Sequence, residues 1–487
     1  MFEATELDQK ISKKDYEALI PDLRTNLLNT QYQILDSDIS VIIIISGVEG
    51  AGKSEVVNRL NEWLDARWIR NHAFWTETEI ERLHPRYWRF WRALPAKGKI
   101  SVMFGSWYTK PIIDRVMEGE SESRLDQEMQ HIVELVHMLA LDNTLIIKFW
   151  FHLPKEISYK RVKDKKLIKS PLQKKFFKMY DQFAVASERA LRLTDTGECR
   201  WHIIEATDKR YRDLTCGQIL LDAMQAKLKM LSESKSPRKE TKSESDTKDT
   251  ITVLDKLKMD YAYSDKNYNQ DIKKYQLKLN KLSWDAYNSG RSVVAIFEGW
   301  DASGKGGAIR RTTAAIDARL YNVISVAAPT DEEKSHHYFW RFWRHLPTDG
   351  YITIYDRSWY GRVLVERVEG FATKEEWFRS YLEINNFEEQ LADHGIILLK
   401  FWIHISKDEQ LRRFKEREKT PWKMHKITDE DWRNRERWND YEMAVNEMVA
   451  RTSTNHAPWI LVPGNNKKYA RVQVIKNICK SLKAAMK

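Results

Sequence analysis

The sequence predicts an α/β fold made of two tandem three-layer α/β/α domains, each with a mainly parallel sheet of about five strands. The first observation is an internal repeat, in which Gly52 and Gly304 lie 252 positions apart (304 − 52). The same spacing carries residues 88–92 (WRFWR) onto residues 340–344 (WRFWR), and chance does not preserve one spacing over so long a stretch. The second is the alternation of short β-branched runs with longer helical patterns in both halves. The third is a glycine-rich segment directly after the first predicted strand of each half.

The strands are predicted from short runs rich in Val, Ile and aromatic residues. Alternation of such runs with helical segments is typical of βαβ units, in which helices cover both faces of a parallel sheet. In such sheets the functional loops lie at the carboxyl ends of the strands. The predicted strands are residues 41–45, 73–76, 100–104, 145–151 and 201–204 in the first half, and residues 293–297, 323–327, 352–355, 396–403 and 459–462 in the second.

The boundary between the domains is predicted near the middle of the chain. With 487 residues the chain is long enough for two domains with cores of ordinary size. Residues 232–250 contain no large apolar side chain, so they cannot bury enough surface to fold and are typical of an exposed linker. We therefore expect a first domain at residues 1–230, a linker at residues 231–250 and a second domain at residues 251–487.

The formal net charge of +11 favours an anionic partner. Nucleic acid, a phosphorylated metabolite and an inorganic polyanion all satisfy this condition. A basic but inert surface explains the charge as well, so the repeated motifs have to decide between these possibilities.

The sequence also indicates where the protein resides. Cys199, Cys216 and Cys479 have neither the spacing of a disulfide framework nor that of a metal site, which fits a reducing compartment. The N-terminal residues carry no secretory signal, and the longest aliphatic run, residues 41–45, is too short to span a bilayer. We expect a soluble, cytoplasmic protein with no membrane partner.

The glycine-rich segment of the second half, residues 299–307 (GWDASGKGG), has the spacing of a phosphate-binding loop. Glycines allow successive backbone N–H groups to face one phosphate, and the N-terminus of the following helix adds partial positive charge. A tight strand-to-helix turn is the structural alternative, but the lysine, the preceding strand and a downstream acidic strand end favour phosphate binding. The predicted phosphate ligands are Gly299, Ser303, Gly304, Lys305, Gly306 and Gly307.

Two acidic residues are candidates for holding Mg²⁺. Gly306 stands where a Ser or Thr hydroxyl normally binds the metal, so another oxygen ligand is needed, and Asp301 is the nearest one. The predicted strand 352–355 continues into Asp356 and Arg357. A carboxylate at this strand end lies beside the phosphate loop, and the adjacent guanidinium can pair with an acceptor phosphate in bidentate fashion.

Arg362 and Glu366 follow this strand end and lie four positions apart, so on a helix they share one face. An ordinary surface ion pair is the alternative explanation. Their position near the predicted acceptor site favours a role in nucleotide binding.

The corresponding loop of the first half, residues 47–54 (GVEGAGKS), matches the standard phosphate-loop pattern better, and phosphate binding there is compatible with the sequence. However, the 252-residue spacing places Asp356 and Arg357 on Phe104 and Gly105. These residues supply neither a metal-binding carboxylate nor a cation for the transferring phosphate. We therefore place the chemistry in the second half.

Four motifs in order resemble the polyphosphate kinase 2 family: residues 299–307, residues 330–347 (TDEEKSHHYFWRFWRHLP), residues 355–370 (YDRSWYGRVLVERVEG) and residues 412–432 (RRFKEREKTPWKMHKITDEDW). The tandem arrangement resembles the two-domain polyphosphate:AMP phosphotransferases of that family. The resemblance implies P-loop kinase-like domains with a helical lid, and transfer of the terminal phosphoryl group of polyphosphate to AMP with Mg²⁺. It assigns functional roles to Asp301, Lys305, Asp356, Arg357, Arg362 and Glu366.

The resemblance also places a mobile lid over the site at residues 412–423. This cationic segment surrounds a Pro-Trp-Lys sequence and could close on a polyanion and exclude water. A solvated charged helix is the alternative, because two glutamates interrupt the basic run. Within the lid we expect Arg413 to take part in catalysis, and Arg412 and Lys423 to bind polyphosphate.

The expected reaction is in-line attack by a phosphate oxygen of AMP on the terminal phosphorus of polyphosphate, without a covalent enzyme intermediate. Inorganic polyphosphate and AMP or ADP are the expected partners and nucleic acid is not, while the resemblance suggests a homo-oligomer. A polyphosphate-dependent nucleoside diphosphate kinase and an ATP-dependent P-loop nucleotide kinase are the catalytic alternatives. A noncatalytic polyanion-binding protein would leave Asp301 and Asp356 beside a phosphate loop unexplained.

Overall fold

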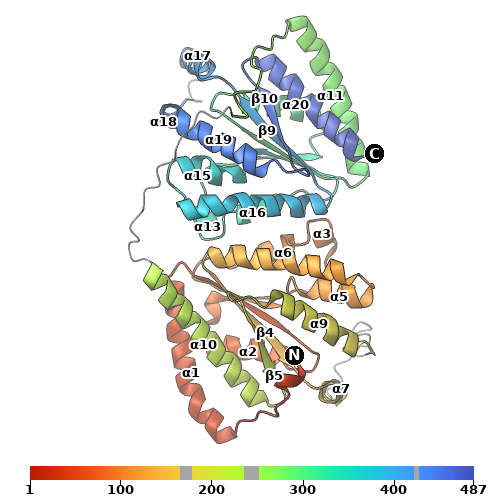
Figure 1. Ribbon diagram of the computed structural model, residues 1–487, viewed down its shortest axis with the longest axis vertical. Coiled ribbons are helices and arrows are strands. Elements are labelled where there is room, and N and C mark those ends of the chain that lie inside the picture. The colour runs from red at the N-terminus through yellow and green to blue at the C-terminus, as the bar shows by residue number, and fades with distance from the viewer. Residues whose placement is uncertain (165–177, 235–251, 422–426, 487) are drawn as a thin grey trace. The chain divides into compact units, whose positions relative to one another are not determined.

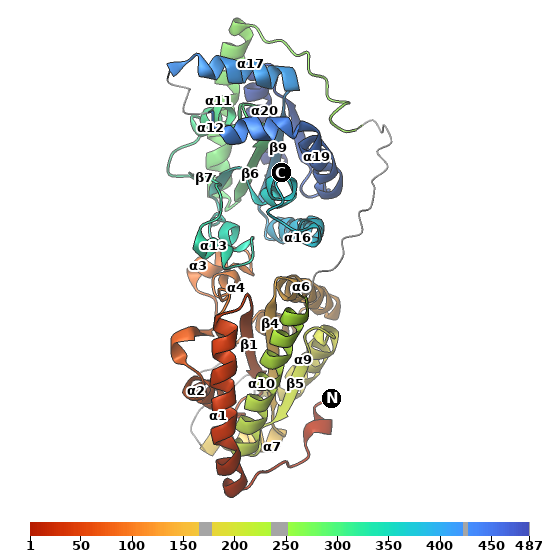
Figure 2. The same cartoon turned by 90° about the vertical axis from the view of Figure 1, so that its left-hand side faces the viewer.

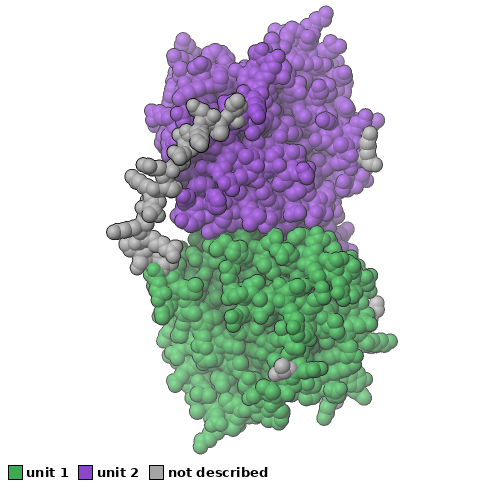
Figure 3. All heavy atoms as spheres, in the orientation of Figure 1, with its two compact units in different colours: residues 1–77, 89–242, 330–337 green, residues 78–88, 243–329, 338–487 purple. Residues whose placement is uncertain are grey.

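The computed structural model describes residues 1–164, 178–234, 252–421 and 427–486 of the chain. These residues form two compact units, which Figure 3 colours separately. Each unit includes a short segment from the other half of the sequence. Unit 1 comprises Met1–Glu77, Arg89–Lys242 and Thr330–His337, and unit 2 comprises Thr78–Trp88, Ser243–Pro329 and Tyr338–Lys487.

The sheet of unit 1 consists of β1 (Ser40–Gly47), β2 (Ile69–Ala73), β3 (Ile100–Phe104), β4 (Thr144–His152) and β5 (Trp201–Glu205). All neighbouring strands are parallel, in the order β2-β3-β1-β4-β5. One helical layer consists of α1 (Lys13–Leu35), α2 (Lys53–Trp63) and α10 (Lys209–Ser234), and the other of α5 (Thr109–Met117), α6 (Glu122–Leu141) and α9 (Tyr180–Thr194). Figures 1 and 2 show these layers on opposite faces of the sheet.

Unit 2 repeats this architecture with β6 (Val293–Gly299), β7 (Tyr321–Ser325), β8 (Ile352–Asp356), β9 (Ile397–His404) and β10 (Trp459–Pro463). Its strands are again all parallel, in the order β10-β9-β6-β8-β7. One layer consists of α11 (Asp265–Asn288), α12 (Lys305–Thr313) and α20 (Lys467–Ala485), and the other of η3 (Trp359–Val363), α15 (Val365–Val368), α16 (Lys374–Asp393) and α19 (Trp438–Thr452). The predicted pair of parallel-sheet α/β/α domains is therefore confirmed.

The remaining elements are short or lie beyond the sheets. They are η1 (Glu3–Thr5), η2 (Ala66–Trp68), α3 (Glu79–Arg82), α4 (Trp88–Trp91), α7 (Lys155–Asp164), α13 (Asp331–Lys334), α14 (Trp340–Trp343), α17 (Lys407–Glu418) and α18 (Asp429–Glu436). The basic segment that the sequence assigns to a lid thus begins within the helix α17. The part of that segment from residue 422 onward lies outside the described residues.

Two of the ten predicted strands are displaced. The predicted strand 73–76 is wrong in all but its first residue, because β2 ends at Ala73, and β7 begins two residues before the predicted 323. Both are edge strands on which most side chains are half-buried or exposed. Neither of these two strands carries a continuous apolar run, so an apolar pattern locates them poorly.

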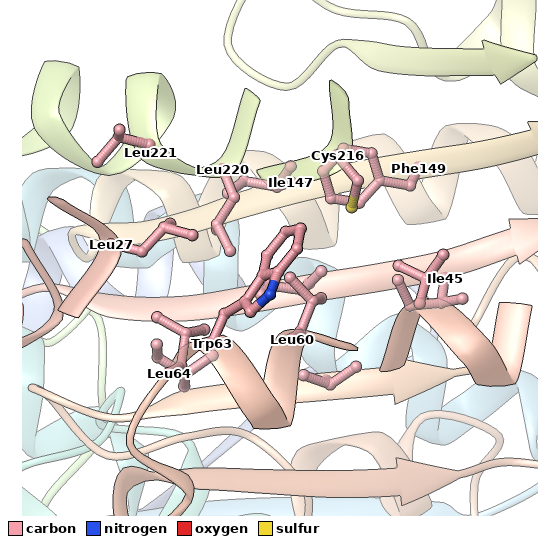
Figure 4. Packing of buried hydrophobic residues seen from close by; sticks show 14 of the residues in the cluster. Leu27, Ile45, Leu60, Trp63, Leu64, Ile147, Phe149, Cys216, Leu220 and Leu221 are labelled. Atoms are coloured by element: carbon pink, nitrogen blue, oxygen red, sulfur yellow. The ribbon is translucent and has the colours of Figure 1, made fainter. Parts of the chain in front are cut away.

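The core of unit 1 packs helix side chains of the first layer against the central strands. Trp63 of α2 is 1% exposed and lies among Leu60, Ile147 of β4 and Leu220 of α10 (Figure 4). The strands β1 and β4 are buried along nearly their whole length, which accounts for their predominantly hydrophobic sequences.

The predicted linker, residues 231–250, lies outside the described residues except for its first four, which end α10. The three cysteines are buried free thiols. No helix in the described part of the chain is both long enough and apolar enough to cross a lipid bilayer.

Candidate active site at the carboxyl ends of β6 and β8

The order of the sheet in unit 2 brings the two predicted functional segments together. Strands β6 and β8 are neighbours, and Phe297 pairs in register with Asp356. The phosphate loop follows β6 and the Asp356–Arg357 pair ends β8, so both lie at the same edge of the sheet. This edge is where parallel α/β sheets bind their ligands.

The phosphate loop has the backbone that its glycines predict. Gly299 has φ +149°, and a Cβ atom there would lie 2.4 Å from the Ile403 carbonyl oxygen of β9. Gly304 has φ +111° and caps α12, which begins at Lys305. The Lys305 ammonium donates hydrogen bonds to the carbonyls of Gly299 (2.5 Å) and Trp300 (3.5 Å), and thus lies folded over the loop.

The loop also contains features that suit an anionic, oxygen-rich ligand. Ser303 is 2% exposed, and its hydroxyl has no hydrogen-bond partner among the described residues. A Cβ atom on Gly306 would meet nothing within 4 Å, whereas one on Gly307 would lie 3.3 Å from the Arg471 guanidinium. The unsatisfied hydroxyl of Ser303 precedes the N-terminus of α12 by two residues, and a phosphate oxygen could engage both it and N–H groups of that first turn.

Asp301 connects the phosphate loop with two other elements. Its Oδ1 lies 3.5 Å from Nη2 of Arg357, and Asn434 of α18 donates a hydrogen bond of 3.0 Å to its Oδ2. Tyr441 of α19 donates in turn to Oδ1 of the Asn434 side chain at 3.2 Å. Asn434 was not identified from the sequence, because nothing in local spacing relates α18 to a loop more than a hundred residues earlier.

The site concentrates carboxylates around one guanidinium. Burial by itself lowers the pKa of Arg357, but the nearby carboxylates, led by Asp301 and Glu298, outweigh it and raise that pKa. Glu298, the penultimate residue of β6, is 5% exposed and accepts a hydrogen bond from the neighbouring Ser358 hydroxyl. Burial raises the pKa of Glu298, and the charge of Lys305 opposes that shift. Glu298 was not identified from the sequence, because it directly follows the predicted strand 293–297 and a lone acidic residue there gives little signal.

Two positions of this site have strained backbone. Arg357 has φ +65° and Ala302 has φ +60°, a region that residues with a Cβ atom rarely adopt. The equivalent positions in the first half are Gly105 (φ +77°) and Gly50 (φ +79°), for which such angles are ordinary. The backbone of the two halves is alike at these positions, and only unit 2 places side chains on it.

Arg362 and Glu366 form an ion pair of 3.0 Å, as their spacing predicts. They do not share one helix, however, because η3 ends at Val363 and α15 begins at Val365. No hydrogen bond or ion pair among the described residues joins them to the Asp301–Arg357 pair. Arg362 is instead packed on the Tyr338 ring, 4.6 Å from its centroid.

Arg413 lies under the phosphate loop. It is 1% exposed and donates hydrogen bonds to the carbonyls of Ala302 (2.9 Å), Ser303 (2.7 Å) and Gly464 (2.6 Å). Arg161 of α7, at the equivalent position in the first half, likewise donates to carbonyls of its own phosphate loop and of the segment after β5. An arginine that binds backbone in both halves braces the loop.

Arg412, the neighbouring basic residue of the lid, makes its ion pairs within α17. Arg412 is exposed and paired with Glu409 at 2.7 Å and with Glu416 at 3.5 Å. This is the arrangement of a solvated charged helix. Lys423 lies outside the described residues.

In the first half, the ammonium group of Lys53 is bound by residues of its own loop, including an acidic one. The Lys53 ammonium donates to the carbonyls of Gly47 (2.8 Å) and Val48 (3.0 Å) and lies 3.4 Å from the Glu49 carboxylate. Glu49 stands at the position of Asp301, whose carboxylate is directed instead toward β8 and α18. The lysine of the first half is therefore partly neutralised by its own loop.

The residues present fit a magnesium ion that arrives with a phosphate ligand. Asp356 is half-buried, and its carboxylate makes no hydrogen bond or ion pair among the described residues. The same residues include no group of three or more His, Cys, Asp or Glu side chains arranged to hold a metal. Magnesium commonly takes one or two carboxylates and completes its shell with water and substrate phosphates. Asp301 and Asp356 supply such a partial set.

Comparisons with known proteins agree with this architecture. The model of the family Polyphosphate kinase 2 (PPK2) matches residues 10–232 and 262–487. A Pseudomonas aeruginosa protein named Polyphosphate:AMP phosphotransferase is 45% identical over 100% of this chain and 99% of its own. An Acinetobacter johnsonii protein of the same name is 37% identical over 95% of this chain and 96% of its own. A crystal structure described as polyphosphate kinase 2 from Pseudomonas aeruginosa superposes with a TM-score of 0.90 at 44% identity, covering 100% of this chain and 99% of that chain. With matches in both of its halves, the chain belongs to the polyphosphate kinase 2 family.

Proposed function

We propose that this protein is a polyphosphate:AMP phosphotransferase, which transfers the terminal phosphoryl group of inorganic polyphosphate to AMP and forms ADP. One observation supports the proposal above all. In unit 2 the phosphate loop that contains Lys305 lies next to the end of β8, where Asp356 and Arg357 stand. Similarity over the full chain to relatives of that name supports the choice of substrates.

The reaction is proposed to take place at the mouth of the loop. The polyphosphate end lies on Gly299, Ser303, Gly304, Lys305, Gly306 and Gly307, while Arg357, Arg362 and Glu366 bind the acceptor nucleotide. An oxygen of the AMP phosphate attacks the terminal phosphorus in line, and the P–O bond to the rest of the chain breaks. The shortened polyphosphate leaves with the electron pair of that bond. A phosphate oxygen is already ionised at neutral pH, so no general base is required.

Magnesium is the proposed cofactor, held by Asp301 and Asp356. When bound, it offsets negative charge on the phosphoryl oxygens. The protein contributes the two carboxylates, and the contact of Asp301 with Asn434 and Arg357 orients the first of them.

The basic residues of the lid take separate roles in this proposal. Arg413 contributes to catalysis by shaping the phosphate loop, since its guanidinium is occupied by backbone carbonyls. Arg412 and Lys423 remain candidates for binding the polyphosphate chain. Release of Arg412 from Glu409 would be necessary for that contact.

We propose that the first half is a noncatalytic partner. Its strand end offers Phe104 and Gly105 in place of an acid and a base, and its Lys53 is engaged by Glu49. Residues 1–230 and 251–487 are the proposed domains, joined by a linker at 231–250. A cytoplasmic, homo-oligomeric protein is the accompanying expectation.

The test combines purified protein, MgCl₂, AMP and polyphosphate in the absence of ATP, and measures ADP by chromatography. Lys305→Ala should lose nearly all turnover, while its counterpart Lys53→Ala should retain most of it. A requirement for ATP would identify a nucleotide kinase, and a preference for ADP over AMP would identify a nucleoside diphosphate kinase. Binding of polyphosphate without turnover would identify a noncatalytic protein, and equal losses in both variants would overturn the assignment to the second half.

A further inference from the structure

A buried ion pair lies next to the turn that follows β8 in unit 2. This turn comprises residues 357–360, the last two of which begin η3. Glu388 of α16 and Lys400 of β9 are both 0% exposed, and their charged atoms are 2.7 Å apart. Desolvation of two charges is costly, and apolar residues of similar volume often stabilise a core equally well. The pair therefore calls for an explanation other than stability.

The Glu388 carboxylate is hydrogen-bonded to the turn itself. Trp359 Nε1 donates to Glu388 Oε1 at 3.1 Å, and the Tyr360 hydroxyl donates to the same oxygen at 2.7 Å. Lys400 Nζ donates to the Tyr360 hydroxyl at 2.9 Å and to the Thr452 carbonyl at 2.7 Å. The ion pair thus fixes two consecutive side chains of the turn to α16, β9 and α19.

Trp359 and Tyr360 follow the strained residue Arg357 by only two and three positions. Arg357 has φ +65°, which a residue with a Cβ atom keeps only where surrounding contacts over-determine the backbone. Its amide also donates to the Phe297 carbonyl at 3.1 Å, which holds the start of the turn against β6. The Glu388–Lys400 pair holds the other end.

The first half lacks the carboxylate as well as the strain. The 252-residue spacing places Val136 of α6 at the position of Glu388. Lys148 is still 0% exposed and donates to the Thr194 carbonyl (2.6 Å), but it forms no ion pair within the part of the chain that the structure describes. The equivalent indole, Trp107, is buried with no hydrogen-bond partner for Nε1 among those residues. Glycine at position 105 needs no such support.

We infer that the buried Glu388–Lys400 pair is a positioning device, which holds Arg357 in its left-handed conformation and directs its guanidinium toward the mouth of the phosphate loop. The inference rests on the proposed function in so far as Arg357 binds the acceptor phosphate. Glu388 touches no substrate and acts through Trp359 and Tyr360. Loss of the carboxylate lets the turn relax and withdraws Arg357 from Asp301.

The kinetic test uses Glu388→Val, which copies the residue of the first half. Its kcat with AMP should fall on the order of 10- to 100-fold, as a displacement of about 1 Å is enough for such a loss. The KM for AMP should rise, whereas the KM for polyphosphate should stay near the wild-type value, because no hydrogen bond or ion pair among the described residues joins Glu388 to the phosphate loop. Glu388→Gln keeps an acceptor oxygen for Trp359 and Tyr360 but removes the charge that pairs with Lys400, so it should recover only part of the activity. Lys148→Met, the matched buried lysine of the first half, should leave kcat unchanged.

The second readout is independent of substrate and consists of thermal unfolding of Arg357→Gly, Glu388→Val and the double variant. Arg357→Gly relieves the backbone strain, so it should raise Tm in the wild type and raise it less in the Glu388→Val background, where the turn has already relaxed. If the wild type forms no ADP, the proposed function fails, but the comparison of these Tm values still tests whether the Glu388–Lys400 pair holds Arg357 in its strained conformation. Equal Tm effects of Arg357→Gly in both backgrounds, or a fall in kcat that matches the unfolded fraction, would overturn the inference.

Discussion

The guanidinium of Arg357 lies 3.5 Å from the carboxylate of Asp301, although the two residues are 56 positions apart in the sequence. The contact joins the end of β8 to the phosphate loop after β6. Arg357 is 45% exposed, so the pair adds little to the free energy of folding. Its consequence is positional, because it places a cation and a carboxylate together at the opening of the loop.

Arg357→Lys should abolish most of the activity while leaving stability unchanged. Lysine keeps the charge but cannot bind a phosphate with two parallel N–H donors, so we expect a loss of roughly 100-fold in kcat/KM for AMP. Steady-state ADP formation measures this loss, and thermal unfolding shows that the fold is retained. Arg319→Lys, in an exposed pair with Asp317, is the matched control and should behave as the wild type. Activity within a few-fold of wild type for Arg357→Lys would show that a simple positive charge is sufficient.

Arg413→Met should destabilise the protein as well as inactivate it. The substitution leaves several buried carbonyls without their donor and Glu409 without its buried partner, which costs about 3 kcal/mol in the free energy of unfolding. Urea denaturation followed by tryptophan fluorescence measures the change. Arg412→Met, one position away and exposed, should alter stability by less than about 0.5 kcal/mol. An inactive Arg413→Met protein of wild-type stability would instead point to direct contact with the substrate.

Gly105→Ala should be more destabilising than Gly119→Ala in the first half. Both glycines have positive φ, +77° and +72°, so each alanine incurs about 1 kcal/mol of backbone strain. At position 105 the added Cβ would also lie 2.4 Å from the Phe74 carbonyl oxygen, whereas nothing lies within 4 Å of position 119. We expect a further loss of about 1 to 3 kcal/mol for Gly105→Ala in chemical denaturation. Equal stabilities of the two alanine variants would contradict this account. The same clash with the Phe74 carbonyl oxygen predicts that Gly105→Arg will not create a second active site.

Unit 2 should lose stability between pH 6.5 and pH 4 because of His404. This imidazole is 8% exposed and accepts a hydrogen bond of 3.1 Å from Trp300 Nε1. Burial lowers the pKa of His404 from 6.5 to about 4. As the pH is lowered through this range, the imidazole of the unfolded chain binds a proton while that of the folded protein does not. The free energy of unfolding therefore decreases by up to roughly 3 kcal/mol between pH 6.5 and pH 4. Denaturation at a series of pH values measures the slope, which should be shallower in His404→Gln. An unchanged slope in that variant would assign the acid sensitivity to other groups.

Much of the fold was predictable from the sequence, since it depends on local patterns. The strands β1, β3, β4, β6, β8, β9 and β10 are predominantly apolar, and the predictions fall on them to within a few residues. The predictions for β2 and β7 were displaced, because most side chains of these two edge strands are half-buried or exposed and their sequences contain no continuous apolar run. Glycine spacing likewise indicated the loop at residues 299–307, in which Gly299 and Gly304 do adopt positive φ.

The site was only partly predictable, because several of its contacts join distant segments. Asn434 and Glu298 were missed, the first because α18 is remote in sequence and the second because a lone acid in a strand gives little signal. The buried position of Arg413 was also not apparent, since a run of basic residues shows the same pattern whether its members face solvent or a loop.

By itself, the sequence determined that one α/β module occurs twice, that each copy has a glycine-rich loop with the spacing of a phosphate loop, and that an Asp–Arg strand end accompanies only the second. These features are local, and hydrophobic periodicity, glycine spacing and the repeat record them directly. Only the tertiary structure decided which side chains meet at the loop, that Arg413 braces it from below, and that Glu388 and Lys400 support the turn at Arg357. Such contacts depend on the order of strands in the sheet and on which face of each helix is buried, and neither is recorded in the spacing of residues along the chain.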